Sequence, residues 1–246
     1  MPTIPESLIR NVTDQVEIVV REVIDRYRRG IYSKEDHMTG ALVSELDRRL
    51  NQLKSINGVK IIAKAFNLKE EIITGADLGV LLSANLLGYV IKKAFIAQAK
   101  ICKCRRTKPR FSNGNIRKDL LEKCQKMLNI TPSSFVIVYT DNFDCSIQVF
   151  PASEIIALNN TISCSSISDL YSMKFKRLFE KLLRCETGDP QIVKGFQEPK
   201  DMETFLKEYK IKHGLFLGFS SEKEKQEEIR RIDEYYNMQK SKKEKK

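Results

Sequence analysis

The stretch TGADLG at residues 74–79, together with FIAQAK at residues 95–100, decides the fold that we expect of this chain. The first stretch places the acid Asp77 at the start of an apolar run, and the second places Gln98 and Lys100 in the next run. In a strand these two residues project to the same face of the sheet, because they are two positions apart. A lysine on an apolar strand is costly to bury unless a negative group faces it. We therefore expect Asp77, a metal ion or a phosphate to lie against Lys100.

Apolar periodicity predicts the elements around these stretches. Apolar residues at three- and four-residue spacings predict helices over residues 6–28, from a cap at 33 to about 53, and over 115–128, 154–158, 168–185 and 201–209. Apolar runs bounded by turn residues predict strands over residues 59–68, from 78 to a turn at 85–88, 89–101, 135–140 and 147–150. Ser33 and Asp36 have the form of a capping box before the second helix. A short apolar segment, residues 215–219, follows the last helix.

The ordered set of a helix, a strand, Gly75-Ala76-Asp77, a strand, Gln98-Ala99-Lys100, a helix and a strand resembles the PD-(D/E)XK, or restriction endonuclease-like, nuclease superfamily. It is similar to the Mrr-like variant, in which Gln replaces the second acid. The resemblance implies an α/β fold, with a central mixed sheet flanked by helices and, in this chain, a C-terminal helical elaboration. We expect one domain over residues 1–220, with its core at about 33–150, and a charged, partly disordered tail over residues 221–246.

The resemblance also implies a site. Hydrolysis of a phosphodiester needs a metal that polarises the phosphate and activates water, and a positive group that offsets charge in the transition state. By the resemblance, Asp77, the side-chain oxygen of Gln98 and the backbone carbonyl of Ala99 hold the metal. Oxygen ligands of this kind suit Mg²⁺ or Mn²⁺. Lys100 would orient the attacking water or stabilise the charged phosphate.

Another carboxylate is expected to complete the metal site, because Gln98 carries one negative charge less than the acid it replaces. Glu35 is the first candidate, since it lies on the inward face at the start of its helix. In the resembling family an acid of the first helix often completes the site. Glu45, further along the same face, and Glu71, just ahead of the strand, are the alternatives. It is an equally good interpretation that Glu35 is a solvated acid near the helix N-terminus, where the helix dipole stabilises its negative charge.

The other site residues have structural interpretations too. Asp77 follows Gly75 and is also typical of a turn, and Lys100 is also typical of the first solvated residue after a strand. Their combination with Gln98 in one ordered set favours a functional site over these alternatives.

Positive charge is concentrated directly after the second stretch. The net charge is +11, of which the tail contributes only +2, so the rest of the chain is itself basic. Residues 100–110 include six basic residues and no acid. Five of these are expected to bind nucleic acid, although a solvated loop is the plain alternative: Lys103, Arg105, Arg106, Lys108 and Arg110.

Cysteine usage and hydropathy indicate the cellular compartment of the protein. The six cysteines lack the paired spacing of a zinc site, and the N-terminus does not resemble a secretory signal, so we expect free thiols and a cytoplasmic protein. The longest uncharged run, residues 78–91, has fourteen residues. A membrane-spanning helix needs about 20, so no contact with a membrane is expected.

These observations together predict a metal-dependent endonuclease, a deoxyribonuclease that hydrolyses DNA and, by the resemblance, restricts foreign DNA in antiviral defence. A homodimer is expected, because cutting both strands commonly requires two active sites. Two alternatives stay open. The chain is either a DNA-binding module that has lost the chemistry, or an interaction subunit that docks a partner protein of a defence or repair complex through residues 221–246.

Overall fold

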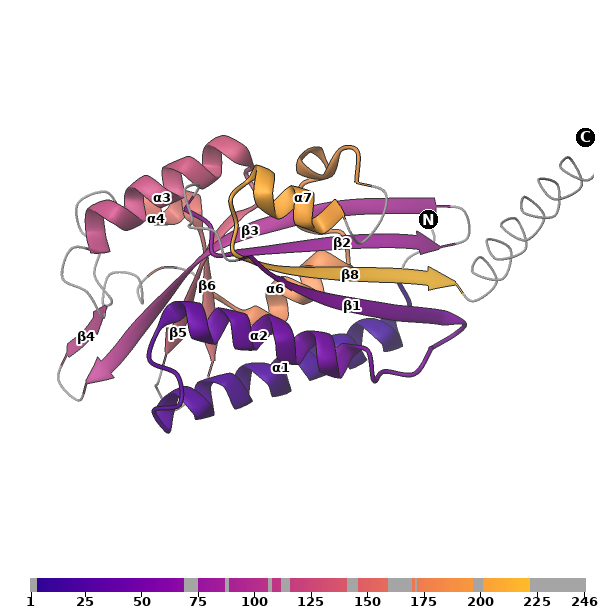
Figure 1. The fold of residues 1–246 in the computed structure, drawn as a ribbon, viewed down its shortest axis with the longest axis horizontal. Helices are drawn as coiled ribbons and strands as arrows, with labels where there is room; N and C mark the ends of the chain where they lie inside the picture. The colour runs from indigo at the N-terminus through magenta and orange to yellow at the C-terminus, as the bar shows by residue number, and fades with distance from the viewer. Residues whose placement is uncertain are drawn as a thin grey trace, which may run out of the picture.

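A mixed β-sheet runs through the middle of the protein, with helices on both of its faces (Figure 1). The computed structural model describes residues 4–68, 75–86, 89–105, 108–111, 116–140, 146–158, 170, 172–196 and 201–221. The expected α/β class, with a mixed sheet flanked by helices, is therefore confirmed. The predicted tail lies outside the described residues, except for Ser221.

Eight strands form this sheet within the described residues. Their order is β1 (Val59–Asn67), β8 (His213–Ser221), β2 (Leu78–Leu86), β3 (Tyr89–Arg105), β5 (Ser134–Thr140), β6 (Ile147–Pro151) and β7 (Met173–Lys174), and β4 (Lys108–Phe111) pairs with the far end of β3. The pairs β2–β8 and β3–β5 are parallel, and the remaining pairs are antiparallel.

Two hydrophobic cores fill the space between the sheet and its helices. The first core packs one face against α1 (Glu6–Arg28), α2 (Glu35–Leu50) and α6 (Phe175–Leu183). The second packs the other face against α3 (Ile116–Ile130), α4 (Ala152–Ala157), α7 (Asp201–Glu208) and the short 3₁₀ helix Gln191–Val193. Alternate residues of β3 enter opposite cores, as a strand covered on both faces requires. Within the described part of the chain, no helix is long and apolar enough to cross a membrane.

The principal difference from the sequence prediction is β8. The apolar segment at residues 215–219 was expected only to follow a helical C-terminal part, but it forms a strand between β1 and β2. It pairs antiparallel with β1 and parallel with β2 over almost its whole length. The C-terminal part is therefore more than a helical elaboration, because it supplies an inner strand of the sheet.

Three helix ends also differ from the prediction. The capping box is wrong: Lys34 is the N-cap of α2, its backbone is extended, and no side chain of the described residues caps the helix. This helix ends at Leu50 rather than near residue 53. The helix predicted from residue 168 begins only at Phe175, and β7 precedes it. Met173 and Lys174, which helical periodicity alone assigns to the helix, pair with β6 instead.

The free edge of β1 is covered by α2. The side-chain amide of Asn51, the C-cap of this helix, bonds both the backbone N–H and the carbonyl of Ala63, at 3.0 and 2.8 Å. Asp47 accepts the N–H of Ala65 at 2.8 Å. An edge strand otherwise offers these groups to another strand, so α2 blocks sheet extension at this edge.

The inner position of β8 predicts a large loss of stability when its core side chains are truncated. Leu217 is fully buried, so Leu217→Ala is expected to lower the free energy of unfolding by about 2–5 kcal/mol. Ile62 of the neighbouring strand β1 is 43% exposed, and Ile62→Ala should cost less than about 1 kcal/mol. Urea unfolding of both variants checks this, and equal losses would contradict the placement of β8.

Candidate active site

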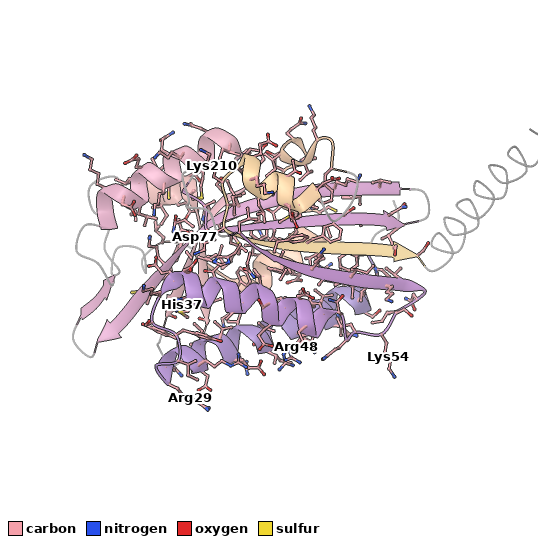
Figure 2. All side chains as sticks on the ribbon, viewed as in Figure 1. Arg29, His37, Arg48, Lys54, Asp77 and Lys210 are labelled. Carbon is pink, nitrogen blue, oxygen red and sulfur yellow. The ribbon has the colours of Figure 1, made fainter. Side chains whose placement is uncertain are left out.

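The candidate site forms beside the part of β3 that extends beyond its pairing with β2. The pairing of the two strands stops at Leu78 and Ala97, whereas β3 continues to Arg105. Past this point, backbone N–H groups on that edge of β3 need other acceptors. Figure 2 shows Asp77 near the middle of the molecule, close to the point where β1, β2 and β8 meet.

Two carboxylates replace the missing strand. Oδ2 of Asp77 accepts the N–H of Ala99 at 2.8 Å, and Oε1 of Glu35 accepts the N–H of Ile101 at 3.0 Å. The two N–H groups are two residues apart on one strand, which is about 7 Å. The acid of the first helix and the acid before β2 are therefore neighbours along one edge.

Gln98 lies between the acid and a carbonyl. Its Nε2 donates a hydrogen bond to Oδ2 of Asp77 and another to the backbone oxygen of Ala99, at 2.8 Å for the latter. Its Oε1 is buried and has no hydrogen-bond partner among the described residues. A buried amide oxygen without a partner is uncommon and costs free energy, so this atom is a candidate ligand for a cation.

Lys100 faces Glu35. Its Nζ lies 3.3 Å from Oε2 of Glu35 and 4.0 Å from Oδ2 of Asp119, and its side chain is only 7% exposed. Lys123, one turn further along α3, pairs with Asp119 at 3.2 Å. From the sequence, Asp77, a metal or a phosphate was expected as the negative partner of Lys100. The direct ion pair is instead with Glu35, which was expected as a metal ligand.

Burial dominates the electrostatics of Asp77. It raises the pKa of this carboxyl from the ordinary 3.8 to about 6, against the hydrogen bond from Ala99 and the charges of Lys100 and Lys123, which lower it. The negative charge of Glu35 adds to the rise. The charged form of Asp77 is therefore disfavoured, and a cation beside this carboxylate would offset that cost.

The structure brings Glu35, Asp77, Gln98, Ala99 and Lys100 together, as expected from the sequence. The reserve candidate Glu45 lies elsewhere, because it pairs with Arg26 and Arg48 at 3.1 and 2.9 Å. The other alternative, Glu71, falls outside the described residues.

The predicted nucleic-acid-binding residues continue from this site along β3 and β4. The backbone register places Lys103 opposite Arg110 and Arg105 opposite Lys108. The fifth, Arg106, lies outside the described residues, as do the side chains of the other four. The hairpin starts two residues beyond Lys100, at Cys102, so its backbone continues directly from the site.

Sequence reasoning missed Asp119 and Lys123 of α3. These residues read as an ordinary solvated pair on a helix, and nothing in their spacing points to Lys100. Their proximity comes from Gly75, whose φ is +90° and at which a Cβ would lie 2.8 Å from the Cα of Lys123. Only glycine allows α3 to approach the segment that carries Asp77 so closely.

His213 was also missed. From the sequence it was expected in a late loop without a visible partner. It is the first residue of β8, only 5% exposed, and its backbone N–H donates to the carbonyl of Asp77 at 3.1 Å. Its partners come from segments far away in sequence, and no local pattern indicates them.

A magnesium or manganese ion fits this set of groups. The described residues contain no cluster of three or more His, Cys, Asp or Glu side chains that could hold a metal, so this candidate depends on mixed oxygen donors. Two carboxylates, a backbone carbonyl and an amide oxygen are donors that these cations accept. Nε2 of Gln98 faces Asp77 and the Ala99 carbonyl, so the amide would have to turn over to offer its oxygen there.

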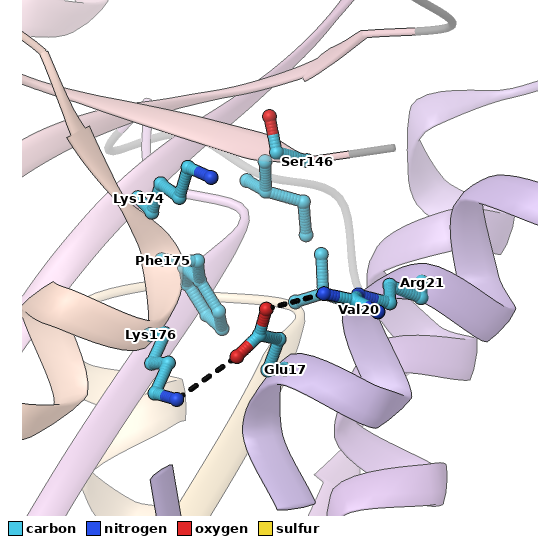
Figure 3. A pocket seen from close by; sticks show the side chains of 8 residues that line it. Glu17, Val20, Arg21, Ser146, Lys174, Phe175 and Lys176 are labelled. Carbon is cyan, nitrogen blue, oxygen red and sulfur yellow. Dashed lines mark hydrogen bonds and ion pairs between the residues drawn. The ribbon is translucent and has the colours of Figure 1, made fainter. Parts of the chain in front are cut away.

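A small hollow lies away from this site, between α1 and the strands β6 and β7 (Figure 3). Glu17 bonds both Arg21 and Lys176 there, at 2.7 and 2.9 Å. Its volume is about 40 Å³, enough for a water molecule. The ion pairs already neutralise the acid, and the hollow is too small for a substrate.

No family model, no curated protein and no solved structure matches this chain. Any function of the site therefore has to follow from the chemistry of its own residues.

Because burial raises the pKa of Asp77, a substitution that removes the negative charge of this side chain should stabilise the protein when no metal is bound. An acid with a raised folded-state pKa binds its proton more tightly when folded, so stability falls as pH rises from about 4 to about 6. Asp77→Asn keeps an acceptor for Ala99 and should gain about 1–3 kcal/mol at pH 7.5 in the presence of a chelator, and nothing near pH 3.

Urea unfolding across this pH range measures the effect. Asp47→Asn is the matched control, because Asp47 also accepts a backbone N–H but lies outside the site. A destabilised Asp77→Asn at pH 7.5 would mean that Asp77 has a structural role.

Proposed function

We propose that this protein is a metal-dependent endonuclease, a deoxyribonuclease that hydrolyses DNA phosphodiester bonds. The observation that carries the proposal is the set of groups at the opened edge of β3. Two carboxylates, an unpartnered amide oxygen and a buried lysine lie there together. Their burial costs stability, and such costs concentrate at functional sites.

The order of elements supports a restriction endonuclease-like core. The sequence of α2, β1, β2, β3, α3 and β5 follows the order of the resemblance, with the acid before β2 and Gln-Ala-Lys on β3. The additional strand β8 lies between β1 and β2. It therefore leaves β2 and β3, which position the motif, as direct neighbours.

Asp77, Gln98, Ala99 and Glu35 would hold Mg²⁺ or Mn²⁺. When bound, such an ion polarises the phosphate and activates water. A half-turn of the Gln98 amide exchanges Nε2 and Oε1, and this turns an oxygen toward Asp77 and the Ala99 carbonyl. An ion held by these groups would favour this orientation, whereas in the structure the amide nitrogen donates to Asp77 and Ala99 instead.

Lys100 supplies positive charge to the phosphate. In the structure its ammonium pairs with Glu35, with Asp119 as a more distant partner. If Glu35 turns to a cation, the ammonium loses its nearest negative group while it remains buried. A negatively charged phosphate then becomes its best partner, and the interaction strengthens as charge develops on the phosphate oxygens.

DNA would bind along the β3–β4 hairpin, which carries Lys103, Arg105, Lys108 and Arg110. Restriction of foreign DNA follows from the resemblance alone. A homodimer would bring two sites to the two strands of the duplex. Pairing through the edge of β1 is not expected, because Asp47 and Asn51 already occupy it.

A DNA-binding module without chemistry is the second candidate. It is favoured by the ion pair between Lys100 and Glu35 and by the Gln98 amide group, which together satisfy Asp77 and Glu35 without a metal. This candidate predicts salt-sensitive DNA binding that is unaffected by a chelator or by Asp77→Ala.

Plasmid cleavage separates the two candidates. We expect wild-type protein with Mn²⁺ or Mg²⁺ to nick or linearise plasmid DNA, and a chelator to abolish the cleavage. Lys100→Ala should lower the rate by at least about 100-fold, because it removes transition-state charge stabilisation. Lys92→Ala, which removes a lysine from the same strand that bonds the carbonyl of Phe196, should cleave normally. Equal cleavage by wild type and Lys100→Ala would exclude this site.

The hairpin predicts a change in the salt dependence of DNA binding. A double variant, Lys103→Ala with Arg105→Ala, should bind DNA more weakly and reduce the slope of log affinity against log salt by about 1 for each phosphate that the variant no longer neutralises. Lys60→Ala with Lys64→Ala, on exposed positions of β1, is the control of equal charge. Fluorescence anisotropy at several salt concentrations measures both, and identical slopes would remove the hairpin from the interface.

A further inference from the structure

His213 occupies the point where three strand ends meet beside the candidate site. As the first residue of β8, it pairs with Asn67 at the end of β1 and with Leu78 at the start of β2. Its backbone N–H donates to the carbonyl of Asp77 at 3.1 Å. The strand that enters the sheet from the C-terminal part therefore holds the main chain of Asp77.

The imidazole of His213 contacts both α2 and β1. Its Nε2 lies 2.8 Å from Oδ1 of Asp36, and its Nδ1 lies 2.6 Å from Oδ1 of Asn67. Lys212 bonds the same oxygen of Asp36 at 2.7 Å. Asp36 is the residue next to Glu35, so the ring holds the turn of helix from which Glu35 reaches β3.

The first turn of α2 depends on such contacts, because no side chain of the described residues caps it. The hydroxyl of Thr39 bonds the backbone oxygen of Glu35 at 2.9 Å and the hydroxyl of the buried Tyr139 at 3.0 Å. These bonds hold the helix axis near the sheet. The bonds from His213 and Lys212 to Asp36 fix this turn against the sheet at the same end as Asp77.

Gly40 lets the ring approach α2. A Cβ at this position would lie 3.2 Å from Cε1 of His213, closer than most side-chain contacts. The ring is thus seated directly on the helix backbone, and an added methyl group would shift it by a few tenths of an ångström.

We propose that His213 is a positioning residue that fixes Asp77 and Glu35 relative to each other, one through its main chain and the other through its ring and Asp36. A metal site tolerates small errors in ligand position poorly, so a residue that links two ligands from separate elements sets the affinity. Imidazole suits this role because its two nitrogens point to opposite sides of a rigid ring, toward Asp36 and Asn67 at once. The proposal rests on the proposed metal site.

The test is Mn²⁺ affinity, measured from the electron paramagnetic resonance signal of free Mn²⁺, together with the melting temperature of each variant. His213→Ala is expected to weaken Mn²⁺ binding by about 10- to 100-fold, the usual effect of removing a residue that supports metal ligands. Gly40→Ala should weaken it in the same direction by a smaller factor. His37→Ala, which removes the exposed neighbouring histidine of α2, should leave the affinity unchanged.

A double-mutant cycle with Glu35→Gln distinguishes positioning from a general loss of structure. If His213 acts through Glu35, the two losses in affinity are not additive, and His213→Ala costs much less in the Glu35→Gln background. Additive losses would overturn the proposal. If His213→Ala does not fold, Asp36→Asn and Gly40→Ala carry the same cycle.

The outcomes separate this proposal from the one on which it rests. Wild-type protein that does not bind Mn²⁺ overturns the metal site and the role of His213 with it. Wild-type protein that binds Mn²⁺, with folded His213→Ala binding equally well, overturns only the role of His213.

Discussion

The backbone of β3 beyond Ala97 imposes the constraint on which the site depends. Its neighbour β2 begins only at Leu78, opposite Ala97, so the N–H groups of Ala99 and Ile101 would lack partners in a partly buried position. Asp77 and Glu35 accept these two hydrogen bonds. The requirement to satisfy the backbone therefore draws two acids from separate segments to one edge, beside the amide of Gln98. An extended β2 would have met the same requirement without burying charge.

The same contacts explain why the site is electrostatically strained. Burial raises the pKa of Asp77, Lys100 is buried against a single close acid, and the amide oxygen of Gln98 has no partner among the described residues. Each of these costs free energy in the metal-free protein. In the proposed function, a divalent cation would offset the first of these costs, and a phosphate would pair with Lys100. Groups placed only for stability would be expected to satisfy one another more completely.

Local pattern was enough to predict much of this arrangement. The two-residue spacing of Gln98 and Lys100 places both on one face of a strand, and the start of α2 directs Glu35 inward. The inner strand β8 could not be found this way, because its pairing with β1 joins residues about 150 positions apart and depends on tertiary packing. The contacts of His213 with Asn67 and Asp36 span 146 and 177 positions, respectively. The ion pair of Glu45 with Arg26 depends on how α1 packs on α2, which periodicity does not reveal.

Diffraction from crystals grown with Mn²⁺, at a wavelength at which manganese scatters anomalously, tests the central claim most directly. We predict one strong anomalous peak within coordination distance of the Asp77 carboxylate and the Ala99 carbonyl, with Oε1 of Gln98 rather than Nε2 facing it. Mn²⁺ bound elsewhere, or no bound ion while Gln98 keeps its amide nitrogen on Asp77, would contradict it.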